Sequence, residues 1–203
     1  MPNEIEAKFK VGDFRAVRRR LKELGAVHLG TDLQTDAYYD TPQRKLLNED
    51  KGLRIRHTRR LRSPSTGDKA DTRAQLTFKG PAGNHKRAKI RREIQTRIDS
   101  HEAMNDVLAA LGLAPTLKIQ KKRASYRLGA CRIELDRLPL IGCFVEIEAR
   151  GADQIETVAG KLRISSEPSK DHYVNLLLGA CRRASSGACQ EITFENCANC
   201  NSA

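Results

Sequence analysis

Five short segments of this chain alternate charged with apolar side chains. The first is Glu4-Ile5-Glu6-Ala7-Lys8, and the same alternation returns at residues 53–56, 76–79, 133–136 and 144–148. Successive side chains of a β-strand point to opposite faces, so each segment predicts a strand with one charged face and one apolar face. Other elements must cover the apolar faces, and this requirement limits the folds that the chain can adopt.

The rest of the pattern predicts an α+β fold with eight antiparallel strands. Short turn-like connections such as Thr41-Pro42 and Leu128-Gly129 favour hairpins between successive strands. The strands are expected at residues 2–11, 27–40, 45–58, 73–80, 87–98, 117–128, 130–137 and 142–150. Amphipathic helices, each with an apolar stripe at helical spacing, are expected at residues 13–24, 101–111, 154–162 and 171–181.

Two arrangements of these strands are open. In the first, the charged faces are ordinary solvent-exposed surface. In the second, the strands form an eight-stranded antiparallel β-barrel with a polar, charged interior, and the helices pack on its outside. Many basic residues share polar faces with carboxylates, and this favours the second arrangement, because a tunnel that binds a polyanion together with divalent cations needs charges of both signs.

The charge balance of the chain predicts an anionic partner. Its 203 residues include 37 Lys and Arg against 25 Asp and Glu, a net charge of +12. Such an excess suits a nucleic acid, an acidic membrane or a phosphorylated small molecule. Nucleic acid is disfavoured, because aromatic residues make up only 4% of the chain and glutamates are interleaved with the basic residues. No segment has the apolar length of a membrane span or the pattern of a leader, so we expect a cytoplasmic protein.

Length and composition predict one domain followed by a tail. Residues 1–183 suit a single domain, and the polar residues 184–203 are expected to be disordered. Cys131 and Cys143 fall inside expected strands, where they are expected to be small apolar residues.

The cysteines near the end of the chain offer an alternative to a disordered tail. The last two form a Cys-x-x-Cys pair, Cys197 and Cys200, which is a spacing found in zinc sites. In this alternative the pair binds zinc together with Cys181 or Cys189. Disorder is the favoured expectation, because the overall spacing is not that of a standard zinc finger.

Six motifs occur in order from Glu4 onward. They are Glu4-x-Glu6-x-Lys8, Gln34-x-Asp36-x-Tyr38-Tyr39-Asp40-Thr41-Pro42, Leu53-Arg54-Ile55-Arg56, Leu76-Thr77-Phe78-Lys79-Gly80-Pro81, Lys121-x-Arg123 and Phe144-Val145-Glu146-Ile147-Glu148. Together they resemble the motifs of the CYTH superfamily, the triphosphate tunnel metalloenzymes, and most of all its class IV adenylate cyclase branch. The resemblance implies a tunnel whose basic residues bind a triphosphate and whose acidic residues bind Mg²⁺ or Mn²⁺.

The carboxylates on the charged faces are the expected metal ligands. Mg²⁺ and Mn²⁺ are hard ions that prefer oxygen, which favours these carboxylates over the cysteines and histidines of the chain. With the resemblance added, the expected ligands are Glu4, Glu6, Asp136, Glu146 and Glu148.

The resemblance assigns basic residues to the phosphate oxygens, which guanidinium groups bind bidentately and lysines attract as point charges. The assigned residues are Lys8, Arg54, Arg56, Lys79, Lys89, Arg91, Lys121, Arg123 and Lys170. Lys170 equally suits a solvent-exposed position before the last helix. The runs Arg18-Arg19-Arg20 and Arg59-Arg60 are expected on the surface.

Two reactions are open for such a site. In a cyclase, the ribose 3′-hydroxyl of ATP attacks the α-phosphorus, and cyclic AMP and pyrophosphate are formed. In a triphosphatase, water attacks the terminal phosphorus of thiamine triphosphate or tripolyphosphate, and Tyr38 and Lys79 match a catalytic pair of thiamine triphosphatase relatives. Only three residues precede Glu4 in this sequence, so we do not expect the His-Phe element that precedes this motif in bacterial class IV cyclases. The cyclase is slightly favoured, and a homodimer is left open.

Overall fold

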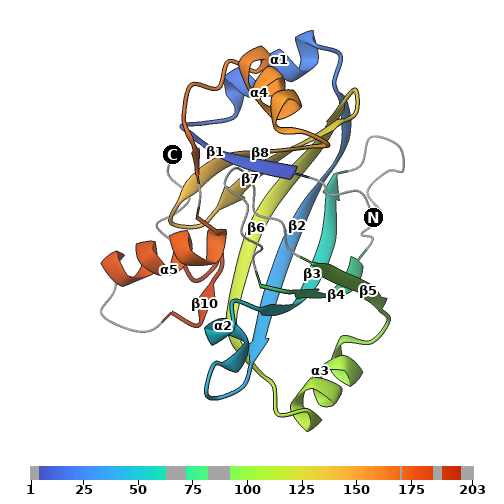
Figure 1. The fold of residues 1–203 in the computed structure, drawn as a ribbon, viewed down its shortest axis with the longest axis vertical. Coiled ribbons are helices and arrows are strands. Elements are labelled where there is room, and N and C mark those ends of the chain that lie inside the picture. The colour runs from blue at the N-terminus through green and yellow to red at the C-terminus, as the bar shows by residue number, and fades with distance from the viewer. Residues whose placement is uncertain (1–4, 63–71, 82–91, 170, 185–188, 198–203) are drawn as a thin grey trace.

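The computed structural model describes residues 5–62, 72–81, 92–169, 171–184 and 189–197 (Figure 1). The helices are α1 (Arg15–Glu23), α2 (Lys45–Asn48), α3 (His101–Ala110), α4 (Ala152–Lys161) and α5 (Tyr173–Ala184). The strands are β1 (Ile5–Val11), β2 (Val27–Asp40), β3 (Gly52–Arg62), β4 (Thr72–Lys79), β5 (Glu93–Ile98), β6 (Ala114–Leu128), β7 (Cys131–Leu138), β8 (Gly142–Ala149), β9 (Pro168–Ser169) and β10 (Glu191–Ile192).

A single curved sheet contains all the described strands. Its order is β5-β4-β3-β2-β6-β7-β8-β1-β9, with antiparallel neighbours throughout, and β10 pairs in parallel with β6 outside this path. The long strands β2 and β6 run side by side through the middle of the molecule (Figure 1). The antiparallel sheet of the predicted fold is confirmed. The expected closed barrel differs from the structure, because within the described residues β5 and β9 remain separate edges.

Most predicted elements lie close to the observed ones, but the segment 45–58 does not form one strand. Its first part is the short helix α2, and β3 begins only at Gly52. The Asp40 carboxylate explains the difference, because it accepts hydrogen bonds from the backbone N–H groups of Leu46 (2.9 Å) and Leu47 (3.0 Å). These bonds satisfy backbone N–H groups at the start of the helical turn. In a strand, the same N–H groups would have paired with a neighbouring strand.

Helices α1, α3 and α4 cover the apolar face of the sheet, as predicted. Val17 and Leu21 of α1 and Ile155 of α4 pack on Ile133 and Ile147 of the sheet. At the other end of the molecule, α3 lies below β3, β4 and β5 (Figure 1), and its Leu108 packs in a second cluster with residues of these strands. No helix in the described part of the chain is long and apolar enough to cross a membrane.

Helix α5 lies on the opposite face from the other long helices. Its Leu177 packs with Ile119 of β6 and Phe144 of β8. Side chains alternate along a strand, so Ile119 shares a face with Lys121, and Phe144 shares a face with Glu146. The helix therefore covers one end of the charged face, whereas the sequence predicts every helix on the outside.

The chain after α5 does not match the expected disordered tail over residues 189–197. The backbone N–H of Lys118 donates to the carbonyl of Gln190 (2.7 Å), and that of Phe194 donates to the Gln120 side chain (3.2 Å). The Ile192 side chain is completely buried. Strand β7 pairs with β6 only from Lys122 onward, so the preceding part of β6 is available to β10.

We expect Ile192→Val to lower the free energy of unfolding by about 1 kcal/mol, because the lost methylene leaves a small cavity in a packed cluster. The matched control is Ile94→Val, since Ile94 is 51% exposed on β5, and its expected cost is below about 0.5 kcal/mol. Urea denaturation of both variants measures the difference. Equal stability of the two variants would contradict the packing of this segment.

Candidate active site

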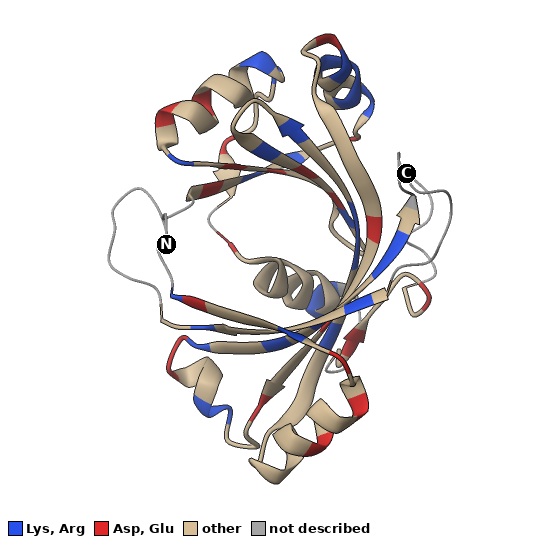
Figure 2. Cartoon of the chain, turned by 90° about the vertical axis from the view of Figure 1, so that its right-hand side faces the viewer, with Lys and Arg blue, Asp and Glu red and all other residues tan. Residues whose placement is uncertain are grey.

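Charged side chains of seven strands lie on the face of the sheet opposite α1, α3 and α4. Figure 2 shows basic and acidic residues interspersed along these curved strands. The cross-strand register places the alternate side chains of these strands on one common face, the charged face. The residues of this face include Glu6, Lys8, Asp36, Tyr38, Arg54, Arg56, Thr77, Lys79, Lys121, Arg123, Glu134, Asp136, Glu146 and Glu148.

One group of charges joins β2 to β3. Asp36 accepts hydrogen bonds from Arg56 Nε (2.6 Å) and Nη2 (2.7 Å), and from Arg54 Nη1 (3.2 Å). Burial raises the pKa of the Asp36 carboxyl, but the two arginines outweigh this effect and hold the pKa well below its usual range. The carboxylate therefore stays ionised and fixes both guanidinium groups on the charged face.

A second group joins β6, β7 and β8. Asp136 is completely buried and accepts hydrogen bonds from Lys121 Nζ (2.9 Å) and Arg123 Nε (2.6 Å). Arg123 also contacts Glu146 through Nη2. Burial opposes ionisation of Asp136, yet Arg123 and Lys121 hold its pKa well below the usual range. The group is a compact ion cluster whose geometry is set by three neighbouring strands.

Lys121 has an unusual protonation equilibrium. Burial lowers the pKa of this ammonium group, and neighbouring Arg123 lowers it further, while Asp136 acts in the opposite direction; the resulting pKa is about 8. The side chain therefore changes its charge close to neutral pH, which an exposed lysine does not do.

The start of α5 contacts the basic residues of this face. Lys8 Nζ donates to the Asp171 carbonyl (3.1 Å) and lies 4.0 Å from the centre of the Tyr173 ring, and Lys121 Nζ lies 5.2 Å from the same centre. Phe144 packs edge-on against that ring. The aromatic ring thus holds two ammonium groups at the end of the charged face that α5 covers.

Several buried polar groups have no hydrogen-bond partner among the described residues, and two of those on this face can donate a hydrogen bond from neighbouring strands. They are Arg54 Nε and Thr77 Oγ1. Arg54 and Thr77 are direct cross-strand neighbours on β3 and β4, and Thr77 is completely buried. Buried donors are rarely left unpaired, so this pair indicates a place for an acceptor from outside the chain.

The carboxylates differ in how well they suit a metal ion. Basic side chains bind Asp136 and Glu146. Glu6 and Glu148 lie directly opposite each other on β1 and β8, and Glu148 also lies opposite Arg132 of β7. Like charges in direct cross-strand contact repel, so a divalent cation between them fits this pair. Within the described ranges, no three His, Cys, Asp or Glu side chains form a ready metal site. Glu4, a further expected ligand, lies outside those ranges.

The expected catalytic pair, Tyr38 and Lys79, lies on β2 and β4, the two strands that flank β3. Tyr38 is cross-strand neighbour to Arg54, and burial raises the pKa of its hydroxyl. Lys79 forms an ion pair with Glu93 of β5 and is half-exposed. The three other expected phosphate ligands, Lys89, Arg91 and Lys170, lie outside the described residues.

Several residues of this face have no role that the sequence predicts. Asp36 and Thr77 lie within recognised motifs at alternate positions, and that spacing was the signal that could have identified them. Tyr173 had no such signal, because it reaches the face through the packing of a helix. Arg60, expected on the surface, forms an ion pair with buried Asp32 (2.8 Å).

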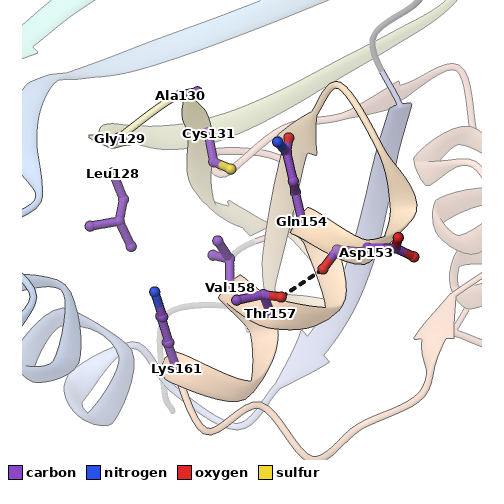
Figure 3. Close-up of a pocket in the computed structure, with 9 residues that line it drawn as sticks. All are labelled: Leu128, Gly129, Ala130, Cys131, Asp153, Gln154, Thr157, Val158 and Lys161. Carbon is purple, nitrogen blue, oxygen red and sulfur yellow. Dashed lines mark hydrogen bonds between the residues drawn. The ribbon is translucent and has the colours of Figure 1, made fainter.

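A hollow of about 420 Å³ lies away from the charged face (Figure 3). Its lining comes from the β6–β7 turn and from α4, including Leu128, Cys131, Thr157, Val158 and Lys161. Thr157 is engaged with the backbone carbonyl of Asp153. The hollow holds none of the clustered charges, so it is not a candidate for the phosphate site.

Comparison with known proteins identifies the family of this chain. The family model for the CYTH domain matches residues 2–172. Adenylate cyclase CyaB of Aeromonas hydrophila is 30% identical over 174 residues, which span 80% of this chain and 82% of the relative. A Pyrococcus horikoshii protein of known structure is 28% identical, with a TM-score of 0.70 over 87% of this chain and 98% of its own.

A more distant structure shares the fold. A protein from Hippeastrum, described as having a dominant triphosphatase activity, is 18% identical, with a TM-score of 0.65 over 87% of this chain and 94% of its own. At that identity the likeness concerns the fold alone. The family model covers most of the chain, and this chain therefore belongs to the CYTH domain family.

Proposed function

We propose that this protein is a metal-dependent enzyme that binds a triphosphate on its charged face, and that ATP is converted there to cyclic AMP and pyrophosphate. The observation that carries the proposal is the pair of unsatisfied polar groups, Arg54 Nε and Thr77 Oγ1, among fixed cations. Phosphate oxygens are acceptors that would satisfy both groups. The choice of cyclisation is supported by the relative named adenylate cyclase CyaB.

The cations are prearranged for such a ligand. Asp36 and Asp136 hold Arg56, Arg123 and Lys121 in place, so little side-chain entropy is lost when the anion binds. Charge that develops on the phosphoryl oxygens and on the leaving pyrophosphate is stabilised by these fixed donors. This prearrangement is the main contribution of the protein to the reaction.

The proposed metal ligands are Glu6 and Glu148, together with Glu146 and Glu4. When bound, Mg²⁺ or Mn²⁺ would supply positive charge to the phosphate oxygens as a Lewis acid. Carboxylate oxygens match the ligand preference of both ions. The residues themselves orient the triphosphate relative to the arginines of β3 and β6.

Hydrolysis of a triphosphate is the second candidate, because the same cations would stabilise attack by water on a terminal phosphorus. Lys121 is proposed as the proton acceptor in either reaction. With a pKa of about 8, it exists partly as the neutral amine near neutral pH and can accept a proton from a nucleophile. Tyr38 and Lys79 remain proposed catalytic residues on the strength of the resemblance.

The deciding experiment incubates the protein with ATP, thiamine triphosphate or tripolyphosphate and either metal, and separates the products by chromatography. Cyclic AMP and pyrophosphate in equal amounts support cyclisation, and orthophosphate from any substrate supports hydrolysis. Turnover is expected to stop when both metals are chelated. No product from any substrate would contradict the proposal.

A nucleic acid is a poorer match for the charged face. The cations that define the face are buried and paired with carboxylates, and those carboxylates would repel a phosphate backbone. Electrophoretic mobility shifts with single-stranded RNA at two salt concentrations test this alternative. Tight, salt-sensitive binding of RNA without turnover of triphosphates would favour a polyanion-binding protein instead.

Triphosphate affinity is expected to fall as the pH rises from about 7 to about 9, by up to about tenfold from Lys121 alone. The reason is that this lysine carries its charge below its pKa of about 8 and loses it above. Calorimetric titration with a non-hydrolysable triphosphate measures the effect. Lys121→Arg, which stays charged, should flatten the pH dependence; an unchanged dependence in that variant would contradict the assignment to Lys121.

A further inference from the structure

Strand β2 carries two buried oxygens on the charged face that receive no hydrogen bond from any described residue. They are Oε1 of Gln34 and Oδ1 of Asp32. Gln34 is 9% exposed and Asp32 is 8% exposed. Both residues alternate with Asp36 along the strand, so the three side chains share one face. Buried acceptors are normally satisfied, so the two oxygens indicate a place for a hydrogen-bond donor from outside the chain.

The contact between Asp32 and Arg60 leaves the carboxylate open to a further donor. Arg60 Nε lies 2.8 Å from Asp32 Oδ1, but the two groups do not have the alignment of a hydrogen bond. Nη1 of the same guanidinium donates to the backbone carbonyl of Leu29 (3.1 Å). Burial raises the pKa of the Asp32 carboxyl more than the neighbouring arginines lower it. A donor that binds this carboxylate would therefore stabilise its ionised form.

Unsatisfied donors and unsatisfied acceptors lie at different places along the charged face. Arg54 Nε and Thr77 Oγ1 belong to one cross-strand row with Tyr38 of β2. Gln34 and Asp32 lie four and six residues from Tyr38 along β2, which is about 13 Å and about 20 Å at the rise of a β-strand. A ligand that reaches both places needs one end that accepts hydrogen bonds and another end that donates them.

We propose that Gln34 and Asp32 bind the organic part of the triphosphate substrate, at the edge of a nitrogen heterocycle where an amino group lies beside a ring nitrogen. This role rests on the proposed function, in which the phosphates lie at Arg54 and Thr77. The Gln34 amide can accept a hydrogen bond from the amino group and donate one to the ring nitrogen, as glutamine side chains do with adenine. The Asp32 carboxylate can accept the second hydrogen of the amino group.

The proposed site distinguishes between classes of triphosphate. Adenine and the aminopyrimidine ring of thiamine both have the required edge, whereas inosine has a carbonyl oxygen in place of the amino group. That oxygen would face the oxygens of Gln34 and Asp32 with no hydrogen between them, which leaves buried acceptors unpaired. Tripolyphosphate has no organic part and cannot use the site. Gln34 and Asp32 would therefore determine which triphosphate the protein prefers.

The test titrates non-hydrolysable analogues of ATP, thiamine triphosphate, inosine triphosphate and tripolyphosphate into the full chain by calorimetry, at fixed Mg²⁺ and salt. The wild type is expected to bind the ATP or the thiamine analogue at least about tenfold more tightly than the inosine analogue, the scale of one buried acceptor left unpaired. The tighter of the first two identifies the heterocycle. This comparison needs no variant, so it does not depend on whether a variant folds.

Gln34→Met keeps the length of the side chain and removes its amide. It should weaken binding of the preferred ligand about tenfold and change the affinity for the tripolyphosphate analogue less than about twofold. The matched control is Gln154→Met, because Gln154 lies exposed on α4, which covers the opposite face of the sheet. The control should leave all four affinities unchanged.

Two outcomes would overturn the role of Gln34 and Asp32 while the phosphate site stands. One is equal binding of the ATP, thiamine and inosine analogues by the wild type. The other is an equal loss of affinity for tripolyphosphate in Gln34→Met, because the amide would then act on the phosphates or on the metal. If none of the four analogues binds the wild type, the proposed function itself is contradicted.

Discussion

Asp136→Asn is expected to lower the free energy of unfolding by about 3 to 5 kcal/mol, because it removes the shared counterion of two buried cations. Asp136 is completely buried and binds both Lys121 and Arg123. After the substitution, Glu146 and the more distant Glu134 (3.9 Å) remain to compensate Arg123. Chemical denaturation of the purified variant at neutral pH measures the loss.

Asp106→Asn is the matched control for this substitution. Asp106 lies exposed on α3, so the same chemical change is expected to cost less than about 0.5 kcal/mol. Asp136 contributes to the free energy of unfolding because its pKa is lower in the folded protein than in the unfolded chain. This contribution is fully present above the carboxyl pKa of the unfolded chain, and it is lost as the pH falls from there toward the lower pKa of the folded protein. Equal stability of the two variants would mean that the ion cluster is not a structural element.

The sheet could be predicted from the sequence because charged and apolar residues alternate along its strands, and each strand keeps one charged and one apolar face in the folded protein. The segment 27–40 was expected as a strand and is β2, and the segments around residues 131–138 and 142–149 were expected within one residue. A strand that buries one face must keep its register, so its pattern is strict. The same alternation identified which residues share the charged face.

The parts that the sequence did not predict depend on contacts between distant segments. Strand β10 has two residues and is defined by its pairing with β6. So short a strand has no periodic pattern in the sequence from which it could be predicted. Helix α5 has an apolar stripe like that of the other helices, and the stripe alone does not determine which face of the sheet the helix covers. Tyr173 therefore reaches the charged face without any sequence signal.

The candidate site also combines residues that the sequence predicted with residues that it did not predict. The basic residues at alternate positions of β3 and β6 followed from strand periodicity and from the motifs. The counterion role of Asp36 required the pairing of β2 with β3, and the unsatisfied hydroxyl of Thr77 required the three-dimensional hydrogen-bond network. Both are properties of neighbouring strands rather than of one segment.

Arg54→Ala is expected to weaken triphosphate binding by about 1.5 to 3 kcal/mol, or about ten- to 150-fold, the scale of lost charge-assisted hydrogen bonds. Arg54 is largely buried, makes one hydrogen bond of 3.2 Å to Asp36, and has an Nε without a partner among the described residues. Thr77→Val, which removes the neighbouring hydroxyl but keeps the side-chain shape, should weaken binding by about 0.5 to 1.5 kcal/mol. The Arg54 variant is expected to fold, because Arg56 remains to pair with Asp36.

In the proposed function this buried face, and not the general positive charge of the protein, binds the triphosphate. Calorimetric titration of a non-hydrolysable triphosphate, at fixed Mg²⁺ and salt, into the wild type, Arg54→Ala and Arg19→Ala distinguishes the two possibilities. Arg19 lies exposed on α1, where screening by salt leaves it little influence on a ligand. We expect at least about tenfold weaker binding for Arg54→Ala and an unchanged affinity for Arg19→Ala. Equal weakening in the two variants would show that the ligand responds to diffuse surface charge and not to the buried face.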